Sequence, residues 1–271
     1  MVNRDCKEVF SSVYGPVCSW RYGTSLGIDP IGQISTCSFN CVYCQLGEIE
    51  NLTRDRRLWI PTHQILADLQ TFAPWEVDII TLSGSGEPTL ALNLGEILQE
   101  IKRLTHKPTL VLTNATLLYD SQVRRELAWA DNVSVKLDGI SESLFRGINR
   151  PEDGITLKQT MEGIKAFKKE FLGKLSLQTM VLSPWSSAMM ERYLTFIHAL
   201  HPDEIQLNTP TRPKPLKREL AGRGNHTLAD PIAYPVQVLK SVSRERLRSL
   251  ADEITQATQV LVRYAPSHSM A

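Results

Sequence analysis

Short β-rich runs and amphipathic helical segments alternate along most of this 271-residue chain. The runs are rich in β-branched or aliphatic residues and are bounded by turn formers, which predicts strands at 78–83, 109–113, 132–137, 174–179 and 204–208. A further strand near residues 31–35 gives about six strand–helix units. Because consecutive parallel strands need a crossover between them, the alternation predicts an α/β fold with a parallel sheet, either closed into a barrel or left open.

The helices predicted between these strands carry their apolar residues on one face. Apolar residues recur at helical spacing over residues 65–72, 94–104, 157–171 and 190–200. The repeat stops at Thr209, and the proline-rich basic stretch at 210–218 is not expected to be helical. A last helix at 244–255 and a short strand at 260–263 are predicted beyond it. We therefore expect a unit at 1–209, which includes an N-terminal lead-in, and a C-terminal extension at 210–271.

Three cysteines lie within eight residues, at Cys37, Cys41 and Cys44, with the spacing C-x3-C-x2-C. Three thiolates on one loop can hold three corners of a cubane 4Fe–4S cluster and leave the fourth iron open to a substrate. Zinc is the main competitor, but a closed zinc site needs four ligands, and no second C-x2-C or H-x3-H follows. The six histidines form no such pair and are expected to be structural. The spacing therefore predicts an iron–sulfur cluster.

Polar residues follow the predicted strands at the points where the strands end. The cysteine loop follows the first strand, and the segment at 85–88 follows the second. Asn114, Asp138 and Asn208 end later strands. Because ligands bind at the carboxyl ends of parallel strands in barrels and in open sheets, we expect these residues to share one face.

Composition and charge exclude several classes of protein. The chain is 42% hydrophobic and 22% charged, as in ordinary globular proteins, and its net charge of +1 requires any polyanion binding to come from a local patch. No apolar run approaches the roughly 20 residues that span a bilayer, and the N-terminus lacks the apolar core of a secretion signal. Three of the five cysteines share one motif, which favours a reducing compartment, so we expect a cytoplasmic location.

These residues, with several further segments, resemble the radical S-adenosylmethionine (radical SAM) enzymes. The three cysteines, with Tyr43 before the last, match the signature of that superfamily. The further segments that carry the resemblance lie at 14–17, 25–29, 41–47, 83–89, 112–114, 135–138, 148–151 and 206–210. Together they are similar to a branch related to the tRNA wyosine-base (4-demethylwyosine) synthases. The resemblance covers roughly residues 10–215 and implies a partial (β/α)6 barrel of the radical SAM type.

The resemblance implies a cofactor chemistry for the cysteine loop. Cys37, Cys41 and Cys44 would bind a 4Fe–4S cluster, and its open iron would take the amino and carboxylate groups of S-adenosylmethionine. One electron from the reduced cluster would release a 5′-deoxyadenosyl radical, which the protein orients and shields from water. An external reductant, a flavodoxin or a ferredoxin, would supply the electron.

The resemblance also implies contacts between the segment at 85–88 and S-adenosylmethionine. The GGEP motif of the family corresponds here to Ser85, Gly86, Glu87 and Pro88, with serine in place of the first glycine. Backbone carbonyls in such a segment would accept hydrogen bonds from the methionine ammonium. The alternative for Glu87 is a surface carboxylate.

Four further residues are candidates for binding S-adenosylmethionine. Tyr43 would lie near the adenine, and Lys136 would meet the methionine carboxylate. Asn114 and Gln178 would bond the ribose or the carboxylate. The alternatives stay open, with Lys136 extending to solvent and Asn114 and Asn208 capping the turns after their strands.

Two cysteines lie upstream of the motif. The wyosine-base synthases carry three additional cysteines for a second cluster that handles pyruvate, whereas this chain has only Cys6 and Cys18. This difference argues against a pyruvate-condensing activity. A buried structural thiol is the default for both, and Cys18 is kept as a candidate for catalysis or an auxiliary metal.

Two basic stretches follow strand ends and would flank the mouth of the active site. They contain Arg54, Arg56, Arg57, Arg212, Lys214, Lys217 and Arg218. Such a rim would attract an anionic substrate, and together with the resemblance it leads to the hypothesis of an RNA substrate, a tRNA base. The alternatives are a solvated surface and the same chemistry on a protein, a peptide or a small molecule. A non-catalytic electron carrier is a remote alternative, because it would need four cluster ligands.

Overall fold

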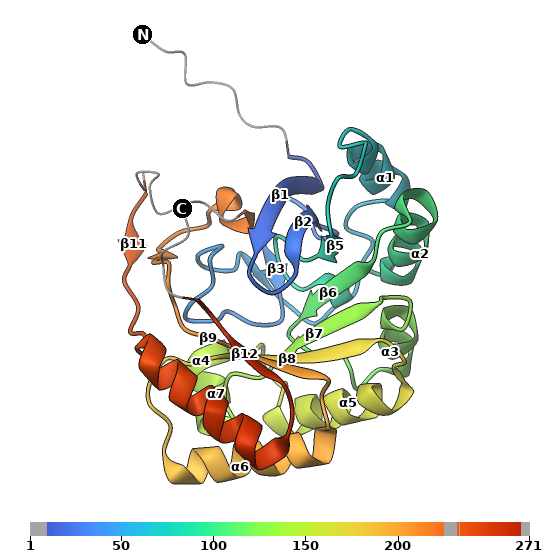
Figure 1. Cartoon of the computed structure of the whole chain (residues 1–271). Coiled ribbons are helices and arrows are strands. Elements are labelled where there is room, and N and C mark those ends of the chain that lie inside the picture. The colour runs from blue at the N-terminus through green and yellow to red at the C-terminus, as the bar shows by residue number, and fades with distance from the viewer. Residues whose placement is uncertain (1–9, 225–231, 233, 267–271) are drawn as a thin grey trace.

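The computed structural model describes residues 10–224, 232 and 234–266, which form a curved sheet with helices along its outer side (Figure 1). The strand order is β1-β2-β5-β6-β7-β8-β9-β12. The bounds are β1 (Val13–Ser19), β2 (Gly23–Ile28), β5 (Ile79–Leu82), β6 (Thr109–Thr113), β7 (Asn132–Lys136), β8 (Lys174–Met180), β9 (Glu204–Asn208) and β12 (Val262–Tyr264). Neighbouring strands are parallel from β2 to β12, and β1 pairs antiparallel with β2. The α/β partial barrel expected from the sequence is confirmed.

The strand predicted near residues 31–35 is wrong, because the first parallel strand is β2. The chain leaves the sheet after Ile28, where the Asp29 carboxylate accepts hydrogen bonds from the backbone N–H groups of Ile31 and Gly32, both at 3.1 Å. Gly32 has a φ of +108°, which bends the backbone away from the sheet direction. Five of the other predicted strands match β5 to β9 within one residue at either end, and the strand predicted at 260–263 overlaps β12.

Seven α-helices lie in the described part of the chain. Their bounds are α1 (Thr62–Gln70), α2 (Leu94–Thr105), α3 (Ser121–Leu127), α4 (Glu142–Asn149), α5 (Leu157–Glu170), α6 (Ser187–Leu200) and α7 (Arg244–Thr258). Helical spacing correctly predicts α1, α2, α5, α6 and α7, whereas the short α3 and α4 carry too few turns to be singled out by it. Helix α5 begins where the Thr156 hydroxyl accepts a hydrogen bond from the Gln159 N–H. None of the described helices is long and apolar enough to cross a membrane.

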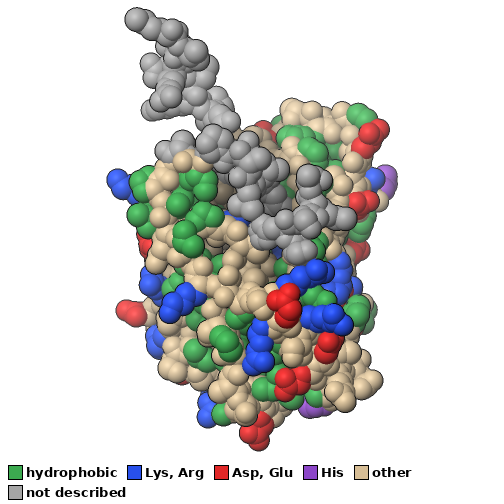
Figure 2. Space-filling model, turned by 60° about the vertical axis from the view of Figure 1, so that its left-hand side comes forward, with side chains coloured by type: hydrophobic (Ala, Val, Ile, Leu, Met, Phe, Trp, Pro, Cys, Tyr) green, Lys and Arg blue, Asp and Glu red, His purple; other side chains and the backbone are tan. Residues whose placement is uncertain are grey.

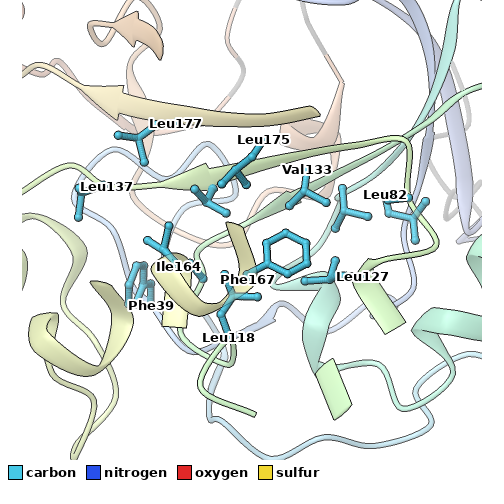
Figure 3. Close-up of a cluster of buried hydrophobic side chains, with 14 of the residues drawn as sticks. Phe39, Leu82, Leu118, Leu127, Val133, Leu137, Ile164, Phe167, Leu175 and Leu177 are labelled. Carbon is cyan, nitrogen blue, oxygen red and sulfur yellow. The ribbon is translucent and has the colours of Figure 1, made fainter. Parts of the chain in front are cut away.

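The main core lies between the sheet and these helices (Figure 3). Ile164 and Phe167 of α5 are fully buried, next to Val133 of β7 and Leu175 of β8. The ring of Phe167 stacks on Phe171 with 4.7 Å between the centroids. Helices bury the strands on one side and the loops of the site bury them on the other. The sequences of the strands are therefore nearly continuous apolar runs.

The two edges of the curved sheet are joined at the turn between β1 and β2. Arg263 of β12 donates hydrogen bonds to the backbone carbonyls of Trp20 and Arg21 in that turn. Gln206 of β9 donates to the Tyr22 hydroxyl at 2.9 Å. The C-terminal extension therefore supplies an edge strand, β12, that pairs with β9 and contacts the opposite edge through Arg263.

Candidate functional site

A pocket of about 350 Å³ lies at the carboxyl ends of the parallel strands. The predicted site residues that line it are Cys37, Cys41, Tyr43, Cys44, Gly86, Glu87, Asn114, Lys136, Gln178, Asn208 and Arg212. Ser85 and Pro88 are buried but do not line it. The topology thus brings the cysteine loop to the same place as the strand-end residues.

The cysteine loop leaves the two-residue strand β3 (Thr36–Cys37), which pairs with β4 (Asn51–Leu52). Within the loop, the Cys44 N–H donates to the Cys41 carbonyl at 3.1 Å. The end of α4 supports the loop from outside, because the Val42 N–H donates to the Ile148 carbonyl at 2.9 Å. The rings of Phe39 and Phe145 also meet edge-on, with 5.3 Å between centroids. The sulfurs are therefore carried on a packed loop.

Two asparagine side chains approach the sulfurs as hydrogen-bond donors. Asn114 Nδ2 lies 3.5 Å from Cys37 Sγ and 2.8 Å from Ser38 Oγ. Asn149 Nδ2 lies 3.5 Å from Cys41 Sγ and donates to Asp138 at 2.6 Å. Donors around a cysteine sulfur tune the clusters that such sulfurs bind. The amide of Asn114 is thereby directed at the cysteine loop.

Charges of both signs surround the three sulfurs: beyond the effect of burial, Glu87 raises the pKa of Cys37 and Asp138 that of Cys41, whereas cations act on Cys41 and Cys44. Burial raises the pKa of the Cys41 thiol to about 12, and Lys136 opposes the shift. Burial also raises the pKa of Cys44, against the opposing effects of a backbone N–H and of Lys136, Lys214 and Arg218. Buried thiols lose their protons on binding metal, and nearby cations favour the resulting thiolates.

The donor set fits a cluster better than a single zinc ion. Among the residues that the structure describes, no three His, Cys, Asp or Glu side chains are placed to hold one metal ion. Three cysteines that bind three different irons of a cubane need not converge on one point, whereas zinc ligands must. Cys37, Cys41 and Cys44 nevertheless line one pocket. Three cysteines on one loop supply the number of thiolates that a cluster with one iron free of protein ligands would take.

The segment at 84–88 packs against the cysteine loop through its backbone. A Cβ atom at Gly86 would lie 1.6 Å from the Thr36 carbonyl oxygen, so only glycine fits there. Glu87 is buried and accepts hydrogen bonds from the Thr113 hydroxyl at 2.6 Å and the Asn114 N–H at 2.7 Å. Burial raises its pKa, and these hydrogen bonds lower it. Glu87 therefore ties this segment to the end of β6 and is not a surface carboxylate.

A hydrogen-bonded network lies beside the cysteines. The Tyr43 hydroxyl donates to Asp138 and accepts from Lys136 Nζ at 3.0 Å. Burial lowers the pKa of Lys136, but Asp138 and the cysteines raise it above its ordinary value. Lys136 thus stays charged inside the pocket and does not extend to solvent. Gln178 lines the same wall and donates to Gln206 at 3.1 Å.

Residues 210–224, which we call the strap, fold back over the cysteine loop. Lys214, in the short strand β10 (Lys214–Pro215), is buried and pairs with Glu48. Arg218 donates to Ser85 Oγ at 2.9 Å and lies 3.4 Å from Glu50. These two cations pair with residues of the cysteine loop and of the segment at 84–88, and they neither line the pocket nor form an open rim around it.

The remaining residues of the predicted basic rim lie outside the pocket lining. Arg56 is largely buried, pairs with Glu126 and donates to the backbone of η1 (Pro88–Leu90) and of the residue after it. Arg54 lies 3.4 Å from Glu152, and Arg57 lies 3.7 Å from Asp55. The exposed Lys217 also lies outside the lining. On the face in Figure 2, lysines and arginines of the described residues are interspersed with acidic side chains.

Several residues at or beside the pocket escaped the sequence reasoning. Arg21 and Arg223 line the pocket, although no local motif marks either of them. Asn149, which approaches Cys41, lies in the segment at 148–151 that carried the resemblance. Its place in that shared motif is the feature of the sequence that could have identified it. Cys18 is exposed on β1 and does not line the pocket, and Cys6 lies outside the described residues.

Comparisons with known proteins identify relatives of the chain. The sequence model of the Radical SAM superfamily matches residues 34–197. A UPF0026 protein of Synechocystis sp. is 62% identical over 257 residues, which cover 95% of this chain and 97% of that protein. A UPF0026 protein of Methanocaldococcus jannaschii is 34% identical over 206 residues, or 74% of this chain and 64% of that protein. Because these relatives are UPF0026 proteins, the finer resemblance to wyosine-base synthases stays a prediction.

A solved structure supports the fold. SuiB of Streptococcus suis, bound to its precursor peptide SuiA, has a TM-score of 0.64 and 18% identity. The match covers 89% of this chain but only 48% of SuiB. The likeness therefore concerns the curved sheet and its helices.

Proposed function

Because this chain belongs to the radical SAM superfamily, whose cofactors are a 4Fe–4S cluster and S-adenosylmethionine, we propose that Cys37, Cys41 and Cys44 hold the cluster. The observation that carries the proposal is the arrangement of three cysteines on one packed loop at the carboxyl ends of parallel strands, in one pocket. When bound, the reduced cluster supplies one electron that cleaves S-adenosylmethionine to a 5′-deoxyadenosyl radical, which abstracts hydrogen from a substrate.

The protein's own residues would bind and orient the cofactors. Lys136 is charged and faces the pocket, so it suits the methionine carboxylate of S-adenosylmethionine. The backbone at Gly86 suits the methionine ammonium, as its carbonyl groups are acceptors. Tyr43 is held by Asp138 and Lys136 beside the cysteines, which suits a position at the adenine. Asn114 and Asn149 would stabilise the loop through the sulfurs.

The finer assignment, an RNA substrate, remains a hypothesis with a narrower basis. Of the seven basic residues predicted to form a rim, Arg212 alone lines the pocket, and Lys214 and Arg218 are engaged with the cysteine loop. A peptide or a small molecule is therefore kept as the alternative substrate. An external flavodoxin or ferredoxin would supply the electron in either case.

The test of the proposed chemistry is the Cys41→Ala variant. The wild-type protein, reconstituted with iron and sulfide without oxygen, should bind about four irons and release 5′-deoxyadenosine with a strong reductant. Cys41→Ala should lose the cluster and all 5′-deoxyadenosine release, since one of three cluster ligands is gone. Equal iron content and equal release in the variant would contradict the proposal.

The substrate class is tested in the same assay with two cell fractions. Stimulation of 5′-deoxyadenosine release by small RNA alone would support an RNA substrate. Stimulation by an RNA-free extract alone would instead direct the search to peptides and metabolites, with Cys41→Ala as the blank in both arms.

A further inference from the structure

Two arginines reach the pocket from opposite parts of the chain. Arg21 stands in the turn between β1 and β2, and Arg212 follows β9 in the strap. The Nε atom of Arg21 is shielded from solvent and has no hydrogen-bond partner. Arg212 donates to the Gly224 carbonyl at 3.1 Å. Within the part of the chain that the structure describes, neither guanidinium pairs with a carboxylate.

Without a bound ligand, this arrangement of two arginines destabilises the folded state. Burial lowers the pKa of Arg21, Tyr22 opposes this effect, and repulsion from Arg212 and Arg263 lowers the pKa further. Burial also lowers the pKa of Arg212. A cation taken out of water without an opposite charge destabilises the folded state, and strongly perturbed groups of this kind cluster at functional sites.

The neighbouring carboxylates are already committed to other partners. Glu87 accepts hydrogen bonds from Thr113 and the Asn114 N–H, and Asp138 accepts from Tyr43. Glu204 is buried and pairs with Lys174 and Arg263. No carboxylate of the described lining is thus left to neutralise Arg21 and Arg212.

The cysteine loop does not account for the two arginines either. The cations with the largest effect on Cys44 are Lys136, Lys214 and Arg218. Arg223, the other arginine of the lining, pairs with Asp29 at 3.0 Å. Arg21 and Arg212 are therefore the lining cations available to a bound substrate.

We propose that Arg21 and Arg212 form a subsite for an oxyanion group of the substrate, a phosphate or a carboxylate. The proposal rests on the proposed function, because it places this group in the pocket that would also hold S-adenosylmethionine. A planar guanidinium donates two parallel hydrogen bonds to such a group, which fixes its orientation as well as its position. The substrate is thus a molecule, or the end of one, whose anionic group enters a pocket of about 350 Å³.

The test is calorimetric titration with inorganic phosphate, pyrophosphate and succinate. Wild-type protein, Arg21→Gln and Arg212→Gln are compared with Arg192→Gln, in which an exposed arginine of α6 is replaced. Loss of charge-assisted hydrogen bonds should weaken anion binding about tenfold to one hundredfold in the two pocket variants and leave Arg192→Gln unchanged. The anion affinity of Arg21→Lys should lie between those of the wild-type protein and Arg21→Gln. Lysine keeps the positive charge but lacks the planar guanidinium that donates two parallel hydrogen bonds. Tighter binding of phosphates than of succinate, or the reverse, identifies the group.

Thermal unfolding distinguishes a structural role of Arg21 from a ligand-binding role. If Arg21 serves a ligand, Arg21→Gln should unfold at the same or a higher temperature than the wild-type protein, because an unneutralised buried charge is removed. A clear fall in the unfolding temperature would overturn the proposal in favour of a structural role.

Two further results separate this proposal from the proposed function. Every titration is made on the metal-free protein and on the protein loaded with iron, sulfide and S-adenosylmethionine. Equal anion affinity in the wild-type protein and all four variants, or no anion binding by a wild-type protein that binds S-adenosylmethionine, would overturn the subsite alone. Failure to bind iron and S-adenosylmethionine would refute the proposed function, while the metal-free titration still decides whether the subsite exists.

Discussion

The contact between the strap and the cysteine loop depends on a glycine in each. Gly222 lies in the single-turn helix η2 (Leu220–Arg223), where a Cβ atom would be 2.1 Å from the carbonyl oxygen of Gln45 and 2.8 Å from its carbonyl carbon. At Gly47, which has a φ of +81°, a Cβ atom would be 2.0 Å from the carbonyl oxygen of Lys217. Because both obstacles are backbone atoms, no side-chain rotation can relieve either clash.

The Gly222→Ala substitution should therefore displace the strap. Its methyl group would be more than 1 Å closer to Gln45 than ordinary contact allows. Overpacking of this kind costs about 1–3 kcal/mol, which for a chain of this size lowers the unfolding temperature by about 2–12 °C. The hydrogen bond from the Glu219 N–H to the Leu46 carbonyl, 2.9 Å long, should be lost or lengthened.

The matched control is Gly147→Ala in α4, because a Cβ atom there would have no neighbour within 4 Å. Alanine is favoured over glycine inside a helix by about 0.5–1 kcal/mol, so this variant should be slightly stabilised. The assays are thermal unfolding of the metal-free protein and the rate at which the reconstituted cluster bleaches in air. Bleaching should accelerate in Gly222→Ala only. Identical unfolding temperatures and bleaching rates in the two variants would refute the argument that the strap shields the cysteine loop.

Two further outcomes are expected. Asn149→Ala removes a donor to Cys41 and should lower the apparent affinity for iron about tenfold to one hundredfold in competition with a chelator, with the fold retained by circular dichroism. An affinity equal to that of the wild type would exclude this role for Asn149. Phe167→Ala should lower the free energy of unfolding in urea by about 3–5 kcal/mol, because Phe167 is fully buried. Leu172→Ala, which removes a fully exposed side chain, should have no such effect, and equal losses in the two variants would contradict the core in Figure 3.

The parallel strands β5 to β9 could be predicted because burial on both faces determines their amino-acid composition. Strands covered on both faces need apolar, β-branched residues along their whole length, and short runs of this kind stand out between helical segments. Strand β2 has the same environment but includes Gly23 and Gly27. Gly27 is required because the Tyr14 ring occupies the space of its side chain, with a ring atom 2.2 Å from the position of a Cβ. That requirement comes from a tertiary contact, so local sequence does not reveal it.

The candidate site was predictable where its chemistry is local in the chain. The three cysteines were identified by their spacing, and the segment at 85–88 by its place after a predicted strand and by the resemblance. The basic residues of the strap were misread, because Lys214 and Arg218 find their partners Glu48 and Ser85 far away in the sequence. A charge run has the same sequence pattern whether it faces solvent or folds inward. Arg21 has no sequence signal, because the burial of its Nε atom without a hydrogen-bond partner arises only in the described fold.

Ser85, which replaces the first glycine of the family motif, has a structural partner in the strap. Its hydroxyl accepts a hydrogen bond of 2.9 Å from Arg218 Nη2, and a glycine at this position would remove that acceptor. Arg218 needs acceptors, because its Nε atom is buried without a hydrogen bond. It is also among the cations that favour a thiolate at Cys44. The serine is therefore more than a tolerated replacement: it positions a charge beside the cysteine loop. Since Arg212 of the same segment lines the pocket, the strap contributes a pocket residue as well as the contact with the cysteine loop.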